Sequence, residues 1–433
     1  MTGRYKAYPE YKDSGVEWLE LLPSSWKIMK VKFLLKDGAE GIKIGPFGSA
    51  LKLEDMVNKG VKVYGQENVI KRDFTLGKRF ISQAKYSDMQ VYTAEQGDIL
   101  VTMMGTSGKC QVVPESAELG IIDSHLLKLR TNDKILPELF RLLVDETKEV
   151  KDQIGKQGKG SIMHGLNSTI VKELEFPLPS LKEQSQILNF LDHETAKIDN
   201  LITKQEKLIE LLKEKRQAVI SHAVTKGLNP DAPMKDSGVE WLGEVPEHWS
   251  VIRLRFLCDI TTGSRDTQDA KENGQYPFFV RSEKVQSIDT YSFEGEGVMT
   301  SGDGAGVGKI YHHFIGKCEI HQRVYLFHNF KHITPRYFYY FLKQNLEPVA
   351  LAQSAKSTVD SLRLPILQEF RMCFGDESEQ KVICEYVDSL SEKYDGLIDG
   401  ANKAIELMKE RKIALISAAV TGKIDVRDWQ ESA

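Results

Sequence analysis

Residues 12–34 read KDSGVEWLELLPSSWKIMKVKFL, and residues 235–257 read KDSGVEWLGEVPEHWSVIRLRFL. The first eight residues of the two copies are identical, and a proline, a tryptophan and a Phe-Leu pair also match farther along. Repetition at such a long interval indicates two copies of one structural unit in a single chain. We therefore expect a fold with internal pseudo-twofold symmetry.

A second pair of repeats occupies residues 183–229 and 379–425. The two segments align without a gap over 47 positions, of which 20 are identical. Longer segments, residues 35–180 and 258–376, lie between the paired elements, and their sequences differ from each other. Because similar elements frame dissimilar inserts, the sequence predicts two recognition modules of different specificity on one symmetric frame.

The second pair of repeats has the end signals of long helices. Ser180 and Asp376 each precede a glutamate by three residues, which is the spacing of a capping box. Gly227 and Gly422 lie where helix C-caps are expected, and no proline interrupts either segment. The sequence therefore predicts two long helices, within residues 181–227 and 377–433.

Apolar residues in both helices alternate in steps of three and four, which is the spacing of a coiled-coil seam. A helix of about 45 residues is about 65–70 Å long, and pairing with its own repeat would bury its apolar side. Because a domain lies between the two copies, an antiparallel pair is the expected closure. The alternative is two amphipathic helices packed in separate cores. The predicted seam consists of Ile198, Leu201, Leu208, Leu212 and Val219 in the first helix and Tyr394, Leu397, Met408 and Leu415 in the second.

Both inserts are predicted to mix strands and helices. Short β-type runs alternate with glycine-rich turns, and a helical stretch follows in each insert. The expected fold class is α+β, with two globular domains joined by two long antiparallel helices. The expected divisions are an N-terminal segment and first domain at 1–180, a central helix at 181–227, a linker and second domain at 228–376, and a helix with a tail at 377–433.

Composition excludes several classes of protein. Charged residues make up 28% of the 433 residues and hydrophobic residues 41%, which excludes wholesale disorder. The sequence has no apolar run of about 18 residues and no signal-peptide pattern, so we expect no membrane partner. Five scattered cysteines fit a reducing cytoplasm. The net charge of −4 excludes a uniformly basic protein that coats nucleic acid, but it allows a local basic face.

These features together resemble the specificity subunit of type I restriction-modification systems, the HsdS family. The resemblance rests on the order of the repeats and on several motifs, and it extends over essentially the whole chain. One departure is that Cys373-Phe374-Gly375 replaces the Pro-Leu-Pro turn of the first half. The motifs are DSGVEWLxxxPxxW at 13–26 and 236–249, IGPFGSALK at 44–52, GDILVTMMGTSGK at 97–109, FPLPSLKEQ at 176–184, and the paired AVxxAVTxG-like helix ends.

The resemblance implies that each insert is a target-recognition domain that reads one half of a split site in double-stranded DNA. It implies that the helices set the spacing of the half-sites and bind two modification (methyltransferase) subunits, to which restriction (translocase) subunits are added. The chain itself would be a non-catalytic part of a cytoplasmic complex that defends against foreign DNA. The S-adenosylmethionine, ATP and Mg²⁺ of the complex would belong to the partner subunits.

Sequence reasoning leaves two other functions open. One is the specificity subunit of a methylation-only or fused type II system. The other is a non-enzymatic coiled-coil scaffold that does not read DNA. The net charge of −4 keeps the scaffold alternative in consideration, because DNA binding requires exposed cations.

DNA recognition needs cations for phosphates and forked polar groups for base edges. Arg281 and Arg323 are the strongest candidates for base contact, because one guanidinium can bridge two acceptors of guanine. Residues 155–161, rich in glycine and lysine, are predicted to form a flexible loop that contacts phosphate. The candidates are Lys43, Ser49, Lys52, Gln66, Asn68, Ser107, Lys109, Lys156, Lys159, His164 and Asn167 in the first insert, and Arg265, Arg281, Ser282, Lys284, Asp303, Gln322, Arg323 and Lys356 in the second.

Sequence signals of catalysis and metal binding are weak. The NPDA sequence at 229–232 lacks the second proline and the aromatic residue of an amino-methyltransferase motif. The GTSGKC sequence at 105–110 is too short for a P-loop and ends in cysteine. The histidines and cysteine within residues 312–321 match no standard zinc spacing. We therefore expect no catalytic residue, cofactor site or metal site in this chain.

Overall fold

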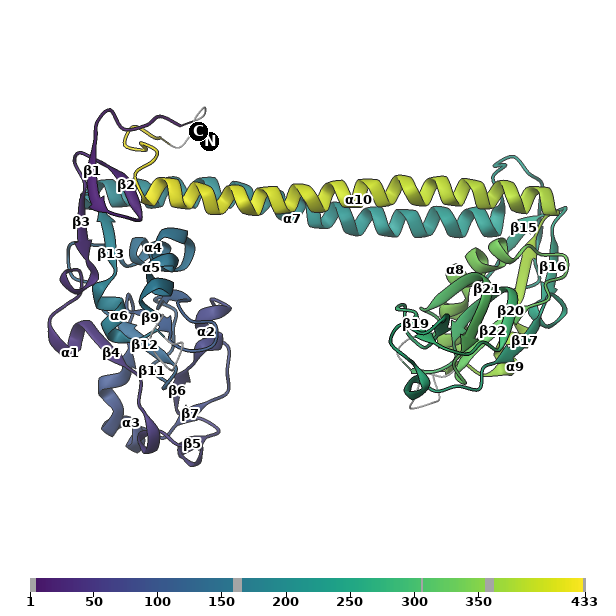
Figure 1. Cartoon of the computed structure of the whole chain (residues 1–433), viewed down its shortest axis with the longest axis horizontal. Coiled ribbons are helices and arrows are strands. Elements are labelled where there is room, and N and C mark those ends of the chain that lie inside the picture. The colour runs from purple at the N-terminus through teal and green to yellow at the C-terminus, as the bar shows by residue number, and fades with distance from the viewer. Residues whose placement is uncertain (1–4, 159–165, 305–306, 355–361, 431–433) are drawn as a thin grey trace. The chain divides into compact units, whose positions relative to one another are not determined.

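The computed structural model describes residues 5–158, 166–304, 307–354 and 362–430, which fall into two units (Figure 1). Unit 1 comprises Met1–Lys204 and Ala404–Ala433, and unit 2 comprises Gln205–Lys403. The long helices α7 (Leu181–Lys226) and α10 (Glu377–Val420) each begin in one unit and end in the other. Each unit therefore contains the start of one long helix and the end of the other.

Unit 1 contains a four-stranded sheet, a five-stranded sheet and two strand pairs. Its strands are β1 (Tyr11–Val16), β2 (Leu19–Pro23), β3 (Lys27–Lys30), β4 (Ile42–Ile44), β5 (Met56–Val57), β6 (Val61–Tyr64), β7 (Phe80–Ile81), β8 (Thr93–Ala94), β9 (Ile99–Thr102), β10 (Cys110–Val112), β11 (Gly120–Ile122), β12 (Leu126–Leu129) and β13 (Glu175–Leu178). Its shorter helices are α1 (Gly38–Gly41), α2 (Gln66–Ile70), α3 (Gln83–Met89), α4 (Pro137–Glu146), α5 (Lys148–Gly158) and α6 (Ser168–Glu173), with 3₁₀ turns η1 (Val31–Phe33), η2 (Gly48–Ala50), η3 (Leu53–Asp55) and η4 (Gln90–Tyr92). The sheet orders are β10-β9-β12-β4 and β5-β7-β6-β11-β8.

Unit 2 contains one six-stranded sheet and two strand pairs. Its strands are β14 (Met234–Asp236), β15 (Glu244–Pro246), β16 (Ser250–Arg253), β17 (Asp259–Thr262), β18 (Tyr276–Phe279), β19 (Gln286–Ile288), β20 (Phe293–Ser301), β21 (Tyr311–Ile320), β22 (Val324–His328) and β23 (Arg371–Phe374). Its shorter helices are α8 (Pro335–Ser354) and α9 (Leu364–Glu369), with 3₁₀ turns η5 (Leu254–Phe256) and η6 (Thr267–Asp269). The sheet order is β17-β22-β20-β21-β18-β19.

These elements confirm the predicted α+β class and the internal repeat. The prediction of a flexible loop at 155–161 is wrong for residues 155–158, because α5 continues through Gly158. Residues 159–161 lie outside the described part of the chain. Among the described residues, no helix is both long enough and apolar enough to cross a membrane.

A two-stranded neck connects each insert to its frame. In unit 1, β3 pairs antiparallel with β13, and in unit 2, β16 pairs with β23 in the same way. Lys30 and Lys32 both contact Glu173, at 2.6 and 2.9 Å. The same ion pairs recur beside the second neck, where Arg253 and Arg255 contact Glu369. The neck therefore belongs to the repeated frame rather than to the variable insert.

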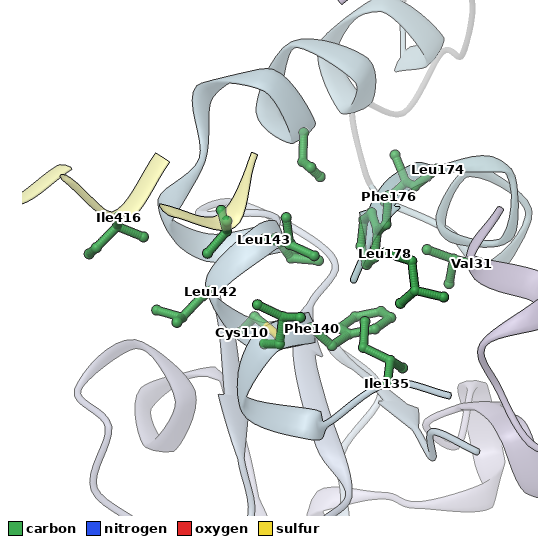
Figure 2. Close-up of a cluster of buried hydrophobic side chains, with 14 of the residues drawn as sticks. Val31, Cys110, Ile135, Phe140, Leu142, Leu143, Leu174, Phe176, Leu178 and Ile416 are labelled. Atoms are coloured by element: carbon green, nitrogen blue, oxygen red, sulfur yellow. The ribbon is translucent and has the colours of Figure 1, made fainter. Parts of the chain in front are cut away.

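The core of unit 1 joins the insert to the ends of the long helices. Figure 2 shows Phe140 of α4, Phe176 of β13 and Ile416 of α10 within one cluster of buried side chains. The rings of Phe140 and Phe176 meet edge to face with centroids 5.0 Å apart. In unit 2, the hydroxyl of Tyr337 donates to the carbonyl of Val224, at 2.7 Å, near the end of α7. The helix ends are thus part of the domain cores.

A buried glutamine fixes the first turn of each long helix. Gln184 accepts from the Leu136 amide at 2.9 Å and donates to the carbonyls of Lys134 and Pro179 at 2.8 and 3.1 Å. Gln380 accepts from the Thr334 amide at 2.7 Å and donates to two further carbonyls, those of His332 and Gly375, at 3.1 and 3.0 Å. Both side chains are completely buried. We call each set of three hydrogen bonds a glutamine clasp.

The capping signals are used only in part. The Glu183 amide donates to Ser180 and the Glu379 amide donates to Asp376, as a cap requires. The glutamate carboxylates do not complete a capping box. Glu183 instead accepts from the Tyr8 hydroxyl, at 2.7 Å, and Glu379 from the Trp249 indole, at 2.9 Å. The repeated motif therefore meets the helix start in unit 2, whereas Tyr8, which precedes the motif, makes the corresponding contact in unit 1.

The predicted glycine C-caps are confirmed. Gly227 and Gly422 have φ values of +77° and +76°, in the left-handed region that ends many helices. A Cβ atom on Gly422 would lie 2.5 Å from the ring of Pro23 and 3.3 Å from Trp26. The corresponding neighbours of Gly227 are the repeated Trp249 and Pro246. The shared Pro-x-x-Trp motif thus covers the glycine that ends a long helix.

This geometry predicts opposite effects for two glycine substitutions in one segment. Gly422→Ala is expected to destabilise unit 1 by about 2 kcal/mol or more, because alanine is strained at positive φ and its methyl group would collide with Pro23. Gly396→Ala is expected to stabilise α10 by about 0.5–1 kcal/mol, since its Cβ would meet nothing within 4 Å. Urea unfolding followed by circular dichroism measures both; shifts in the same direction would refute the role of the cap.

The seam between the long helices differs from its predicted register. In each unit the segments of α7 and α10 are antiparallel, as expected, and Ile198, Tyr394 and Leu415 are buried. The seam role of Leu201, Leu208 and Leu397 is wrong, because these side chains are 51%, 43% and 49% exposed. The inward-facing positions are Ile198, Ile202, Gln205, Ile209, Leu212, Arg216 and Val219 in α7, and Tyr394, Ile398, Ala401, Ile405, Met408, Lys412 and Leu415 in α10.

Two equivalent ion pairs link the long helices at this seam, one within each unit. Lys412 lies 2.7 Å from Asp199 in unit 1, and Arg216 contacts Asp395 in unit 2. The four residues occupy matching positions of the two helical repeats. An exposed pair of this kind contributes little stability. Its effect is to favour one antiparallel register over shifted ones.

Candidate nucleic-acid interface

Loops that follow four strands gather at one edge of the sheet in unit 2. Ser301 pairs with Val324, so the end of β20 lies beside the start of β22. The end of β17 lies beside the same strand, and β18 runs parallel to β21, so their ends also lie together. We define the strand-end edge of unit 2 as residues 263–266, 280–284, 301–304 and 321–323.

Unit 1 has the corresponding arrangement. Leu126 of β12 pairs with Thr102, which ends β9, and the amide of Gly45 after β4 donates to the Leu126 carbonyl at 3.0 Å. The Asp123 amide donates to the Tyr64 carbonyl at 2.9 Å, which joins the ends of β11 and β6. We define the strand-end edge of unit 1 as residues 45–48, 65–66, 103–107 and 123–125.

The same turn lies at the centre of both edges. In unit 1 the carboxylate of Asp123 accepts from the His125 amide at 3.0 Å. In unit 2 the imidazole Nδ1 of His321 accepts from the Arg323 amide, also at 3.0 Å. His125 and Arg323 are therefore equivalent positions. One scaffold presents different side chains in its two copies.

The edge of unit 2 is built around one carboxylate between two arginines. Asp303 accepts from Nη1 of Arg281 at 2.8 Å and from Nη1 of Arg323 at 2.6 Å. The arginine side chains are 39% and 58% exposed. Burial opposes ionisation of Asp303, but the two arginine hydrogen bonds hold the pKa of its carboxyl below the usual value. The edge thus presents two exposed guanidinium groups that are fixed from one side.

A second polar group extends this edge. Gln322 donates to Asp266 at 2.5 Å, and Arg265 lies 3.9 Å from the buried carboxylate of Glu319. His321 is buried beside them, and burial lowers the pKa of its imidazole. Ser282 donates to the Lys284 carbonyl at 2.8 Å, which shapes the loop after β18. The structure therefore brings together the second-insert candidates Arg265, Arg281, Ser282, Lys284, Asp303, Gln322 and Arg323.

The edge of unit 1 has a different chemistry. Phe47 is 62% exposed and Met104 is 42% exposed, although both are large and apolar. The edge also holds His125, and Arg79 is anchored beside it, with its guanidinium 3.0 Å from Asp123. Sequence reasoning missed all four residues. The available signal in the sequence was the Gly-Pro-Phe-Gly turn that carries Phe47, because such turns keep side chains at the surface.

Three candidates in the first insert have structural roles. Asn68 is buried, accepts from the Gly65 amide and donates to the carbonyls of Asp73 and Leu76. Asn167 is the N-cap of α6 and accepts from the Ile170 amide at 2.9 Å. Lys109 lies 2.8 Å from the buried carboxylate of Asp145. These contacts give the three residues structural roles in the domain, and their predicted DNA contacts stay predictions.

The other first-insert candidates are dispersed. Ser107 and Gln66 belong to the strand-end edge of unit 1. Lys43 lies over the Tyr92 ring, 5.2 Å from its centroid, and Lys52 pairs with Glu54 at 2.9 Å. Lys156 lies on α5, 3.5 Å from Glu17. Candidates outside the described residues are Lys159, His164 and Lys356, together with the side chain of Ser49.

The described residues contain no group of three or more His, Cys, Asp or Glu side chains placed to hold a metal ion. His312 and His313 lie on β21, where the first contacts the Ser282 carbonyl at 3.2 Å and the second contacts Glu296 at 2.8 Å. Cys318 is buried, and burial raises the pKa of its thiol to about 12. These side chains are explained by packing and hydrogen bonding within the sheet.

Comparison with known proteins identifies the repeated domain. The model of the family described as the type I restriction modification DNA specificity domain matches residues 48–211 and 246–407. The MjaVIII specificity subunit from Methanocaldococcus jannaschii is 27% identical over 339 residues, which cover 71% of this chain and 75% of that protein. The EcoDI specificity subunit from Escherichia coli is 26% identical over 188 residues, which cover 43% of this chain and 41% of that protein.

Two solved structures share the fold. One was determined in a study of complex assembly and conformational transition of the type I R-M system. It has a TM-score of 0.68, is 17% identical, and the match covers 93% of this chain and 99% of that chain. The HsdS subunit from Thermoanaerobacter tengcongensis has a TM-score of 0.53, is 16% identical, and the match covers 93% of this chain and 98% of that chain.

Proposed function

Since this chain belongs to the type I restriction modification DNA specificity family, we propose that its two domains each read one half of a bipartite site in double-stranded DNA. The observation that carries the proposal is the duplicated strand-end edge. Both units expose the same loops on the same scaffold, but with different side chains. Two readers of different sequences require this combination of a shared fold and dissimilar contact chemistry.

We further propose that the helix pair sets the distance between the half-sites. α7 has 46 residues and α10 has 44, and neither is interrupted. A continuous helix has a fixed rise of about 1.5 Å per residue. The spacing between the half-sites would then be a property of the frame, and the bases read would be a property of the inserts.

Exposed apolar residues support docking of two copies of one partner on this frame. Leu201 and Leu397 occupy matching positions of the helical repeats and are 51% and 49% exposed. Phe33 and Phe256 match in the other repeat and are 56% and 58% exposed. Exposed apolar patches of this kind mark interaction sites. We assign them to two modification subunits, one for each half of the frame.

In this proposal the chain is not itself an enzyme, and it acts within a cytoplasmic restriction-modification complex. The modification subunits bind S-adenosylmethionine and methylate an adenine in each half-site after flipping it out of the helix. Restriction subunits supply cleavage and use ATP and Mg²⁺. A scaffold without DNA reading is disfavoured, because it would not need the two different loop edges.

The test is single-molecule sequencing of adenine methylation in host DNA, with and without the gene for this chain. We expect a split motif that is methylated in both half-sites and that disappears on deletion, because no other part of the complex would select the sequence. The control is a copy of the gene on a plasmid, which is expected to restore the motif in the deletion strain. Unchanged methylation in the deletion strain, with the modification subunits still produced, would refute the proposed function.

A further inference from the structure

The two arginines of the unit 2 edge are held as a pair. Arg281 follows β18 and Arg323 precedes β22, and both bind the one carboxylate of Asp303 through Nη1. A backbone hydrogen bond from the Arg323 amide to His321 fixes the turn that carries the second arginine. His321 is itself buried and stacks with Phe278, with ring centroids 6.4 Å apart. The pair is therefore positioned by a hydrogen-bonded turn that packs on the sheet.

The free capacity of this pair matches the major-groove edge of guanine. A guanidinium has five N–H donors in one plane, so binding Asp303 through Nη1 leaves the Nε and Nη2 donors for a second, bidentate partner. Guanine O6 and N7 are two acceptors at the spacing of such a fork. Because both arginines bind oxygens of one carboxylate, they can reach neighbouring base pairs, which stack at about 3.4 Å.

We propose that Arg281 and Arg323 each read a guanine, so that the half-site bound by unit 2 contains two neighbouring G·C pairs. Asp303 is a positioning residue that holds both forks. This inference rests on the proposed function and adds the class of base that one domain selects. The two guanines lie on one strand or on opposite strands of the half-site.

The corresponding place in unit 1 has no such pair among the described residues. Arg323 is replaced by His125 in the equivalent turn. Arg79 lies over Gly65, because a Cβ atom on that glycine would be 2.1 Å from Nη2 of Arg79. The Arg79 guanidinium is bound to the largely buried Asp123. Phe47 and Met104 add two exposed apolar side chains to this edge, which the described residues of the unit 2 edge lack. The guanine signature is therefore specific to unit 2.

The experiment compares methylation motifs in hosts that express the complete system with variants of this chain. In the wild type, replacing either G·C pair of a site is expected to reduce its methylation by about tenfold or more. Arg281→Ala and Arg323→Ala are each expected to remove the preference at one G·C position. Asp303→Ala is expected to weaken the preference at both positions, and the other half-site stays unchanged in all three variants.

Lysine substitutions separate base reading from phosphate contact. Arg281→Lys and Arg323→Lys keep the charge but lose the planar fork, so the guanine preference is expected to fall in these variants too. A phosphate contact would tolerate lysine. Lys271→Ala is the matched control, because Lys271 is exposed and paired with Asp289 at 2.6 Å, and it precedes the start of β18, whereas Arg281 follows its end. It is expected to leave the motif unchanged.

The outcomes distinguish this inference from the proposed function. If a bipartite motif depends on the chain but the arginine variants leave both G·C positions selective, or if the positions that relax are A·T pairs, the guanine assignment is overturned. If no motif depends on the chain, the proposed function itself fails. Where a variant abolishes methylation, co-purification with the modification subunits shows whether the complex still assembles. Gel-shift binding to wild-type and G-substituted duplexes then measures the base preference directly.

Discussion

Replacing Gln380 with leucine is expected to lower the free energy of unfolding of unit 2 by about 3–5 kcal/mol. The glutamine makes three hydrogen bonds in a completely buried site, to the Thr334 amide and to the carbonyls of His332 and Gly375. Leucine fills a similar volume but satisfies none of these groups. Buried backbone groups without partners cost the full desolvation penalty, which exceeds the apolar gain.

The internal repeat supplies a second measurement of the same effect. Gln184→Leu is expected to destabilise unit 1 by a similar amount, because Gln184 makes the equivalent three bonds. Gln217→Leu is the control, since Gln217 is exposed on α7, and its effect is expected to stay within about 0.5 kcal/mol. Urea unfolding followed by far-ultraviolet circular dichroism measures all three. An effect of either clasp variant no larger than that of Gln217→Leu would show that the clasps do not stabilise the units.

The frame of the molecule could be predicted from sequence because its signals are local and occur twice. Gly227 and Gly422 both end helices, as their positions after proline-free segments indicate. Ser180 and Asp376 both cap the following helix. Each interpretation could be checked against its repeat. Such agreement between copies makes a short capping pattern far more reliable than it is alone.

The register of the helix seam could not be predicted in the same way. Leu201 is followed by Ile202, Leu208 by Ile209, and Leu397 by Ile398. Either member of each pair continues an alternation of three and four residues, although adjacent residues differ by about 100° around a helix. The structure places the isoleucines inward. Only the packing against the second helix decides between the two registers.

Side-chain roles at the strand-end edges were the least predictable feature. Asn68 and Asn167 carry the side-chain amide that base-reading residues use, but each amide bonds nearby backbone groups, as asparagine often does in turns and caps. Phe47 and Met104 were missed because apolar residues are ordinarily assigned to the core. Arg281 and Arg323 were predicted to contact bases, but their shared carboxylate depends on strand pairing that sequence spacing does not reveal.

Exchanging residues 258–362 for the corresponding insert of a relative with known specificity is expected to replace one half-site completely. The other half-site and the spacing between them are expected to stay the same, because the proposed readers are independent and the helix pair is untouched. The structure defines the boundaries of the exchange. Leu257 is buried in the core cluster that includes the end of α7, and α9 is tied to the neck through the contact of Glu369 with Arg253 at 3.1 Å.

An exchange that extended to residue 376 would remove Glu369 and the neck strand β23, and it would test folding rather than specificity. The measurement is methylation sequencing of host DNA with the hybrid chain in place of the natural one. A useful control returns the original insert into the same junctions, which is expected to restore the original motif. A change in both half-sites, or a new spacing with both half-sites kept, would contradict the division of labour between inserts and frame. A change confined to one half-site would place base recognition in residues 258–362, since only those residues differ between the two chains.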